Sequence, residues 1–208
     1  MKIKKIAALC SREGVFHLAS KTDREGVVTQ WLGDGGAFYP LLGAPVLDEA
    51  GLCTMFDITG KKRDSTIVRC DEMSKRLNVD DLDPKDIRLA PEELSINYHG
   101  ATIIPLRGTA GTLYIEEKYL EPLDDERKLL ELYSRTAHGK TYVVVKAGMM
   151  IRGIIGPHLV TQGLADKLDT IAWACKEELA RQKQEQEQLQ REMSWAGNFE
   201  ETIEESEG

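Results

Sequence analysis

Hydrophobic residues recur over the first thirteen positions at the spacing of one helix face. Ile3, Ile6, Ala7 and Cys10 follow the pattern i, i+3, i+4, i+7, which is typical of an amphipathic helix with one buried side. We therefore predict a helix over residues 1–13. Gly14, which follows, is expected to end it.

Short β-branched or alternating stretches follow, separated by glycine-rich turns. The segments predicted as strands are 15–19, 27–32, 37–41, 66–70, 94–98, 101–106, 112–115, 141–146 and 149–155. Their connections have hairpin length, whereas a parallel doubly wound sheet would need crossover helices. The pattern predicts an α+β protein with antiparallel sheets of short strands.

Two further helices are expected after the strands of the middle. Residues 124–135 place several leucines behind acidic residues of a first turn, which predicts a short helix in the middle of the chain. A long C-terminal helix is predicted to begin at Thr161. An apolar stripe that should pack on the body runs along it: Leu164, Leu168, Ile171, Cys175 and Leu179.

Beyond Leu179 this stripe continues with Gln182 and Gln186, so core packing should stop there although helix propensity remains high. We expect a division into residues 1–75 (a helix with a β-meander), 76–92 (a connector rich in Asp, Lys and Pro) and 93–181 (a second half of strands and helices). Residues 182–208 should form a projecting helix end, followed from residue 196 by an acidic disordered tail.

Composition narrows the class of protein. The chain has 208 residues, of which 41% are hydrophobic and only 6% aromatic, which argues against a stacking surface for single-stranded nucleic acid. No apolar run approaches the length of a membrane span, and the stretch after Lys2, Lys4 and Lys5 is too short for a signal peptide. We expect a cytoplasmic protein with no membrane partner.

The net charge of −8 is unevenly distributed. Residues 196–208 contain five Glu and no Lys or Arg, so this short segment supplies more than half of the net charge. The acidic balance therefore leaves room for basic patches on the rest of the chain.

Candidate catalytic chemistry is sparse. The four cysteines form no CxxC pair and the four histidines follow no ligand spacing, and Cys10 and Cys175 are expected to be buried thiols. The glycine clusters at 33–36 and 108–112 match no phosphate-binding motif and are predicted hairpin turns. We predict a protein that is not an enzyme and uses no cofactor or metal, with a metal-dependent nuclease as a less favoured alternative.

Two sets of residues are candidates for binding. Cations that could contact the phosphates of duplex DNA lie on the first helix and in a predicted turn: Lys2, Lys5, Arg12, Lys61, Lys62 and Arg63. Bulky apolar residues near the C-terminus could dock into a partner protein, and we name them the C-terminal arm: Leu189, Met193, Trp195 and Phe199.

Some sequence segments resemble known families. QWLGDG at 30–35, AFYPL at 37–41, KYLEPL at 118–123 and VKAG at 145–148 resemble an uncharacterised family encoded in bacterial prophages. A weaker similarity is to sliding-clamp (processivity factor) domains, in which a helix followed by several strands occurs twice. Residues 2–13 with their meander, and 124–135 with 141–155, are similar to two such units, with residues 33–35 as the matching turn. The final glutamine-rich helix has no counterpart in a clamp.

These observations lead to two functional hypotheses. The first is a non-enzymatic, phage-encoded binding module, a clamp-like accessory of DNA metabolism that contacts duplex DNA without reading its sequence. The second is a protein-interaction or oligomeric structural module with no role in nucleic-acid binding. In both, the C-terminal arm contacts either a second copy of the chain or a different protein.

Overall fold

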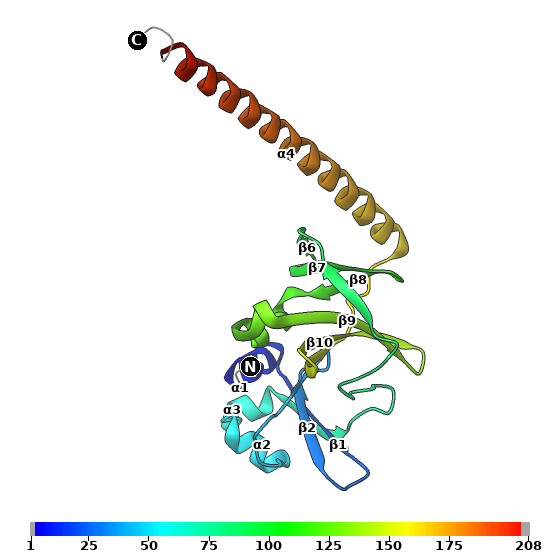
Figure 1. The fold of residues 1–208 in the computed structure, drawn as a ribbon. Helices are drawn as coiled ribbons and strands as arrows, with labels where there is room; N and C mark the ends of the chain where they lie inside the picture. Colours follow the sequence, from blue (N-terminus) through cyan, green and yellow to red (C-terminus); the bar gives the residue numbers. More distant parts are fainter. Residues whose placement is uncertain (1–2, 205–208) are drawn as a thin grey trace. The chain divides into compact units, whose positions relative to one another are not determined.

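The computed structural model describes the backbone of residues 3–204 and the side chains of residues 3–161 and 163–191. The chain divides into two units, the first ending at Leu159 and the second beginning at Val160. The first unit, here called the body, combines helices with a many-stranded sheet, and the second is one long helix (Figure 1). The predicted α+β class is confirmed.

The helices and strands of the body follow one another closely along the chain. In order they are α1 (Ile3–Glu13), β1 (Val15–Thr22), β2 (Val28–Gly33), β3 (Ala37–Pro40), α2 (Glu49–Met55), α3 (Gly60–Asp64), β4 (Ile67–Glu72), β5 (Ile87–Pro91), β6 (Ile96–Tyr98), β7 (Ala101–Gly108), β8 (Gly111–Glu116), the 3-10 helix η1 (Glu117–Leu129), β9 (Leu130–Ala137), β10 (Lys140–Ala147) and β11 (Met150–Ile155). Helix α4 (Gln162–Glu204) forms the second unit.

A single sheet contains strands from the beginning and from the end of the body's sequence. Its strand order is β4-β1-β2-β3-β11-β10-β9-β5-β7-β6, and β8 pairs with β7 beside this path. The pairs are antiparallel as predicted, with one exception among the described residues: β4 runs parallel to β1, with Val15 opposite Ile67. Helices α2 and α3 lie between β3 and β4 in the sequence and carry the chain back, so that β4 can enter the sheet in this direction.

Two similar units meet at the centre of this sheet. Helix α1 is followed by the meander β1-β2-β3, and η1 is followed by the meander β9-β10-β11. The last strands of the two meanders pair with each other, with Ile154 opposite Phe38 and Ile155 opposite Ala37. The residues before the predicted connector and those that follow it as far as Leu159 therefore both belong to the body.

The short helix predicted at residues 124–135 is wrong in type and position. The 3-10 helix η1 ends at Leu129, and strand β9 then runs from Leu130 and pairs with both β10 and β5. The leucines at 129, 130 and 132 fit a helical period, but Leu130 and Leu132 also fit the two-residue period of a strand. Pairing on both sides of β9 outweighed the local helical preference.

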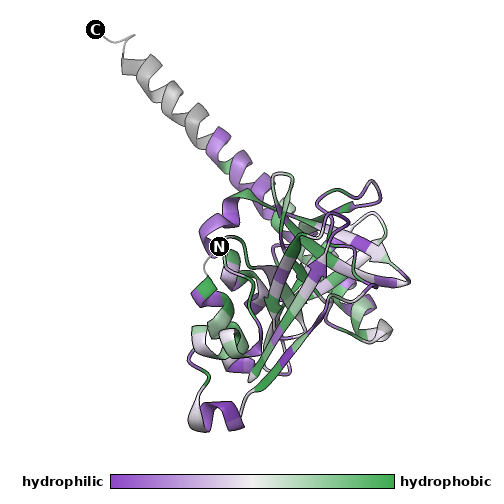
Figure 2. Cartoon of the chain, turned by 90° about the horizontal axis from the view of Figure 1, so that it is seen from below, coloured by the Kyte–Doolittle hydropathy of each residue, from purple (hydrophilic) through white to green (hydrophobic). Residues whose placement is uncertain are grey.

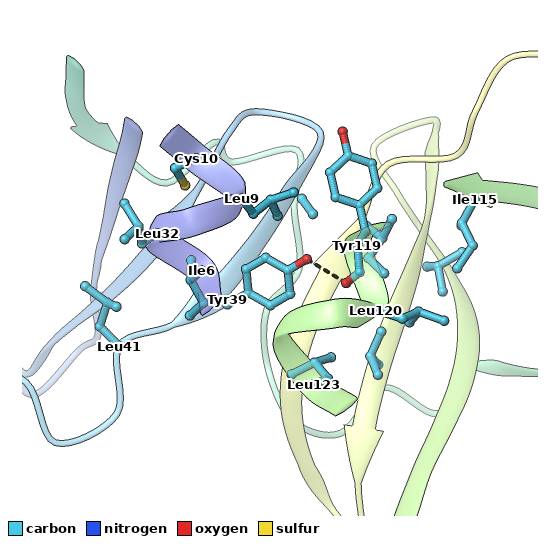
Figure 3. Packing of buried hydrophobic residues seen from close by; sticks show 14 of the residues in the cluster. Ile6, Leu9, Cys10, Leu32, Tyr39, Leu41, Ile115, Tyr119, Leu120 and Leu123 are labelled. Atoms are coloured by element: carbon cyan, nitrogen blue, oxygen red, sulfur yellow. Dashed lines mark hydrogen bonds between the residues drawn. The ribbon is translucent and has the colours of Figure 1, made fainter. Parts of the chain in front are cut away.

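The main core lies between α1, η1 and the strands beneath them (Figure 3). Ile6 and Cys10 of α1 are buried as predicted, Leu9 is buried as well, and Ile3 and Ala7 of the predicted face are half-buried. The Tyr39 hydroxyl of β3 donates a hydrogen bond of 2.6 Å to the carbonyl oxygen of Tyr119 in η1. Colouring by hydropathy shows apolar residues along the strands of the sheet and hydrophilic ones over much of the coloured part of α4 (Figure 2).

The predicted connector is held to the sheet by a buried charge cluster. The Arg135 side chain has no exposed surface and donates two bonds of 2.7 Å, from Nε and Nη2, to the Asp86 carboxylate. Lys146 Nζ donates to the same carboxylate at 2.7 Å. Further bonds reach the connector backbone, because Arg135 Nη1 donates to the carbonyl oxygens of Asn78 at 3.0 Å and Asp80 at 2.6 Å. This segment is therefore part of the body rather than a flexible boundary.

The predicted glycine turns are confirmed. The segment from Gly33 to Gly36 connects β2 with β3, and Asp34 Oδ1 accepts hydrogen bonds from the backbone N–H groups of Gly36 at 2.8 Å and Ala37 at 3.0 Å. A β-carbon on Gly33 would overlap the carbonyl oxygen of Ala37. Position 33 therefore requires glycine because a larger residue has no space there, and not because of an unusual φ angle.

Helix α4 begins where predicted, since the carbonyl oxygen of Thr161 accepts from the N–H groups of Leu164 and Ala165. Its backbone remains helical as far as Glu204, across most of the segment expected to be disordered. Glutamate, which is frequent there, is a good helix former. Residues 205–208 of the predicted tail lie outside the described residues.

Candidate binding surfaces

The cations predicted on the first helix lie beside acidic residues of η1. Lys5 Nζ is 3.6 Å from a carboxylate oxygen of Asp124 and 3.6 Å from one of Asp125. Arg12 Nη1 donates to Glu121 Oε2 at 3.3 Å. Lys2, the third cation of this face, lies outside the described residues. The two described cations of this face are thus already neutralised, which reduces their attraction for phosphate.

The second predicted set lies on α3, a short helix where a turn was expected. Arg63 pairs with Glu49 of α2, and Lys62 Nζ donates to the carbonyl oxygen of Phe56 at 3.0 Å. Lys61 is exposed. The α3 cations therefore have partners on and after α2, whereas those of α1 pair with η1. Among the five candidates that the structure describes, Lys61 is the best placed to meet a polyanion.

A hollow in the described part of the body has a volume of about 800 Å³ and is lined by residues of α1, β6, β7, β8 and η1. Lys118 lies between two carboxylates there, with Nζ 2.8 Å from Glu116 Oε2 and 3.0 Å from Glu13 Oε1. His158 Nδ1 lies 3.3 Å from the other Glu116 oxygen. A continuous charge network thus connects α1 to the end of β8.

This network shifts the proton affinity of its members. Burial by itself would raise the pKa of Glu116, but hydrogen bonds from Lys118 and His158 outweigh burial and hold this pKa below its ordinary value. Hydrogen bonds to Glu116 and Glu13 raise the pKa of Lys118 against the effect of burial. Both groups are therefore held in their charged forms, which makes each a poor proton donor or acceptor near neutral pH.

Aromatic side chains form one wall of the hollow. The ring of Tyr98 meets His99 edge-on at 4.2 Å and His158 edge-on at 6.1 Å between ring centres. His99 has a positive φ of 49° at the turn between β6 and β7. These contacts orient the two histidine rings around Tyr98. The hollow is polar, but the lining cations Arg12, Lys118 and Arg127 each face a carboxylate, so it offers no excess of positive charge to an anion.

Metal and thiol chemistry receives little support from the part of the chain that the structure describes. There, no group of three or more His, Cys, Asp or Glu side chains could hold a metal ion. Cys10 is buried as predicted, and burial raises the pKa of its thiol to about 12. Cys175 was also expected to be buried, but it is exposed.

The side chains of the apolar stripe predicted on α4 are largely exposed or only half-buried. Ile171 is 50% exposed, Leu179 is 46% exposed, and Leu164 and Leu168 are only half-buried. The second unit consists of this one helix, so its apolar face has no second layer within the unit to cover it. Leu189 of the C-terminal arm is 58% exposed, and the side chains of Met193, Trp195 and Phe199 lie outside the described residues.

Sequence reasoning missed the charge network around Lys118 and the cluster around Arg135. Their members are far apart in the sequence, for example Glu13 and Lys118 or Asp86 and Arg135. The dense run Glu116-Glu117-Lys118 was visible but resembles any solvated strand end. Only the pairing of remote strands brings these groups together.

Comparison with known proteins adds no constraint. A scan against protein-family models finds no match, and searches of the curated proteins and of the solved structures find no similar chain. Among the described helices, none combines the length and the apolar character needed to cross a membrane.

Proposed function

We propose that this chain is a non-enzymatic binding module that acts through helix α4. The observation that carries this proposal is the apolar stripe of α4, which remains exposed at Ile171, Cys175, Leu179 and Leu189 on a helix of 43 residues. A row of exposed apolar side chains on one helix face, here interrupted by Gln182 and Gln186, is typical of an interaction site or an aggregation hazard. The body supplies a stable support, and α4 supplies the contact.

The hollow on the body favours a binding function over catalysis, because its charged groups are poorly suited to acid–base chemistry. An acid–base catalyst needs a group whose pKa lies near the working pH, whereas Glu116 and Lys118 are both shifted away from neutrality by their mutual pairing. The network fits a role in holding η1 and α1 together. A binding function is therefore the better supported class.

Deletion of residues 160–208 tests the role of α4. We expect the remaining body to fold and to melt at the temperature of the full chain, because its core clusters come from residues before Leu159. The deleted protein should lose the oligomeric state or the protein partner of the full chain. Circular dichroism and analytical ultracentrifugation measure the two properties. Precipitation or early melting of the body would contradict the proposal, because α4 would then be part of the core.

A second candidate is a clamp-like accessory of DNA metabolism. One specific observation favours it: two helix-plus-meander units meet at the pair β3 and β11, with α1 against η1 on the same core. The order of a helix followed by strands is the one expected from the sequence, but the second helix is η1 at Glu117–Leu129 and not a helix over 124–135. The pairing of Lys5 and Arg12 with acids of η1 weighs against it.

Filter binding of duplex DNA distinguishes the two candidates. A clamp-like module should bind weakly, without sequence preference and with an affinity that falls steeply as salt rises. Removing residues 196–208, which carry five Glu, should strengthen binding, and Lys61→Glu should weaken it. The matched control is Lys75→Glu, a change of equal charge at an exposed position outside the candidate set. No retention of DNA at low salt by the protein lacking 196–208 would exclude this candidate.

A further inference from the structure

The apolar stripe of α4 continues beyond the residues that first define it. Leu164, Leu168, Ile171, Cys175 and Leu179 are followed at the same spacing by Gln182, Gln186 and Leu189. At 100° per residue, all of these positions fall within an arc of about 80° on the helix surface. Their separations of three and four residues are close to those of a coiled-coil seam, with two glutamines at core positions. The two successive steps of four residues from Ile171 to Leu179 form a stutter, which locally unwinds a coiled coil.

We propose that α4 forms a parallel, in-register coiled coil with α4 of a second copy of the chain. This inference rests on the proposed function, because it names the partner that α4 binds. The helix has 43 residues, or about 64 Å of length. Its described seam runs from Leu164 to Leu189 on one face of the helix and is interrupted by a single stutter.

The two glutamines determine the direction of pairing. In a parallel, in-register pair, Gln182 faces Gln182 and Gln186 faces Gln186, so that each amide has a donor and an acceptor opposite it. In an antiparallel pair centred on the described seam, Gln182 would face Ile171 and Gln186 would face Leu168. Each amide would then be buried against an apolar side chain without a hydrogen bond.

Charges beside the seam also favour a second copy. Glu178 flanks the seam on one side and Lys183 flanks it on the other. In parallel helices, a residue on the first flank faces the partner residue five positions later on the opposite flank. Glu178 of one copy therefore meets Lys183 of the other, on both sides of the pair. Within one helix Glu178 also accepts from Arg181 Nη2 at 2.7 Å and from Gln182 Nε2 at 3.1 Å, so pairing of two helices would exchange part of these bonds for contacts with the second copy.

Thiol crosslinking of the full chain tests the direction. In a chain carrying Cys175→Ser, the further change Leu189→Cys places one new thiol on the seam near its described end. A parallel pair brings the two thiols together, so a short bismaleimide should join two chains at that position. The matched control is Cys175→Ser alone, which keeps the exposed Cys70 and should give no dimer. Absence of a dimer through residue 189 in a chain that sediments as an oligomer would overturn the parallel arrangement.

A pair of isosteric substitutions tests the seam itself. Gln182→Glu places two carboxylates opposite each other and should weaken self-association at least tenfold at pH 7, with recovery near pH 4 when they are protonated. Gln184→Glu makes the same change on the opposite face of the helix and should alter the association less than twofold. Sedimentation equilibrium measures both. Equal effects of the two changes would overturn the inference.

The outcome for the full chain also separates this inference from the proposed function. A full chain that remains monomeric at high micromolar concentration overturns the coiled coil and leaves a different protein as the partner of α4. An oligomer that survives deletion of 160–208 overturns both, because the contact would then belong to the body.

Discussion

Asp86→Ala is expected to lower the free energy of unfolding of the body by about 3–5 kcal/mol, the cost of removing one partner from a buried ion pair. The Asp86 carboxylate accepts from Arg135 and from Lys146 at 2.7 Å, and the side chains of all three are nearly or fully buried. Without it, two buried cations lose the carboxylate that they share, and Asp83, whose Oδ2 lies 3.9 Å from Arg135 Nε, is too distant for a hydrogen bond that would replace it. Urea denaturation followed by circular dichroism measures the loss.

The same substitution should change the response to acid. Burial alone would raise the pKa of Asp86, but the bonds from Arg135 and Lys146 outweigh burial and lower it. A carboxylate with a lowered folded pKa stabilises the protein above its unfolded pKa of about 3.9, and this contribution is lost as the pH falls through the folded value. The difference in stability between wild type and variant should therefore be full at pH 7 and shrink below about pH 4.

The control for this prediction is Arg88→Ala. Arg88 lies two residues from Asp86, and its Nη2 pairs with Glu131 Oε1 at 2.8 Å, but the Arg88 side chain is 71% exposed. Loss of such a surface pair should cost at most about 1 kcal/mol. If Asp86→Ala costs no more than Arg88→Ala, the buried cluster does not hold the connector to the sheet.

The second large effect is expected from Gly33→Ala, at about 3 kcal/mol, the upper end of the usual cost of overpacking. The new β-carbon would overlap the carbonyl oxygen of Ala37 and lie 2.7 Å from its carbonyl carbon. Both belong to the backbone of β3, which pairs with β2 on one side and β11 on the other. Relief would need a shift of strands at the centre of the sheet.

Gly26→Ala is the matched control for this position. No atom lies within 4 Å of a β-carbon at Gly26, but its φ of +84° strains any other residue, at about 1–2 kcal/mol. Comparison by thermal melting separates lack of space from backbone strain. A Gly33→Ala protein as stable as the Gly26→Ala protein would show that β3 can move to make room.

Local patterns in the sequence predicted the local features of the fold. The spacing of Ile6 and Cys10 predicted α1, and the glycines around Asp34 predicted the turn between β2 and β3. Prediction was wrong where two periods overlapped, as at Leu130 and Leu132, because only the pairing partners of β9 decide between helix and strand. The parallel entry of β4 depends likewise on contacts that no single segment encodes.

The candidate binding residues were predictable in position but not in environment. Helical spacing placed Lys5 and Arg12 on one face, yet their partners Asp124 and Glu121 are more than a hundred residues away in the sequence. The stripe of α4 was recognised from its period, whereas the sequence carries no direct signal of what covers it. The hydrophobic period of a sequence shows which face of a helix is apolar, but only the tertiary structure shows which residues lie against that face.

The position of β11 in the sheet has a consequence for how the protein is made. This strand is the last of the body in the sequence, but it lies between β3 and β10 near the middle of the sheet. During synthesis, both neighbours present unpaired edges until residue 155 has left the ribosome, and open edges invite pairing with other chains. The growing chain is thus most exposed to aggregation just before its central strand arrives, so chaperone dependence should be greatest for nascent chains that end before Met150.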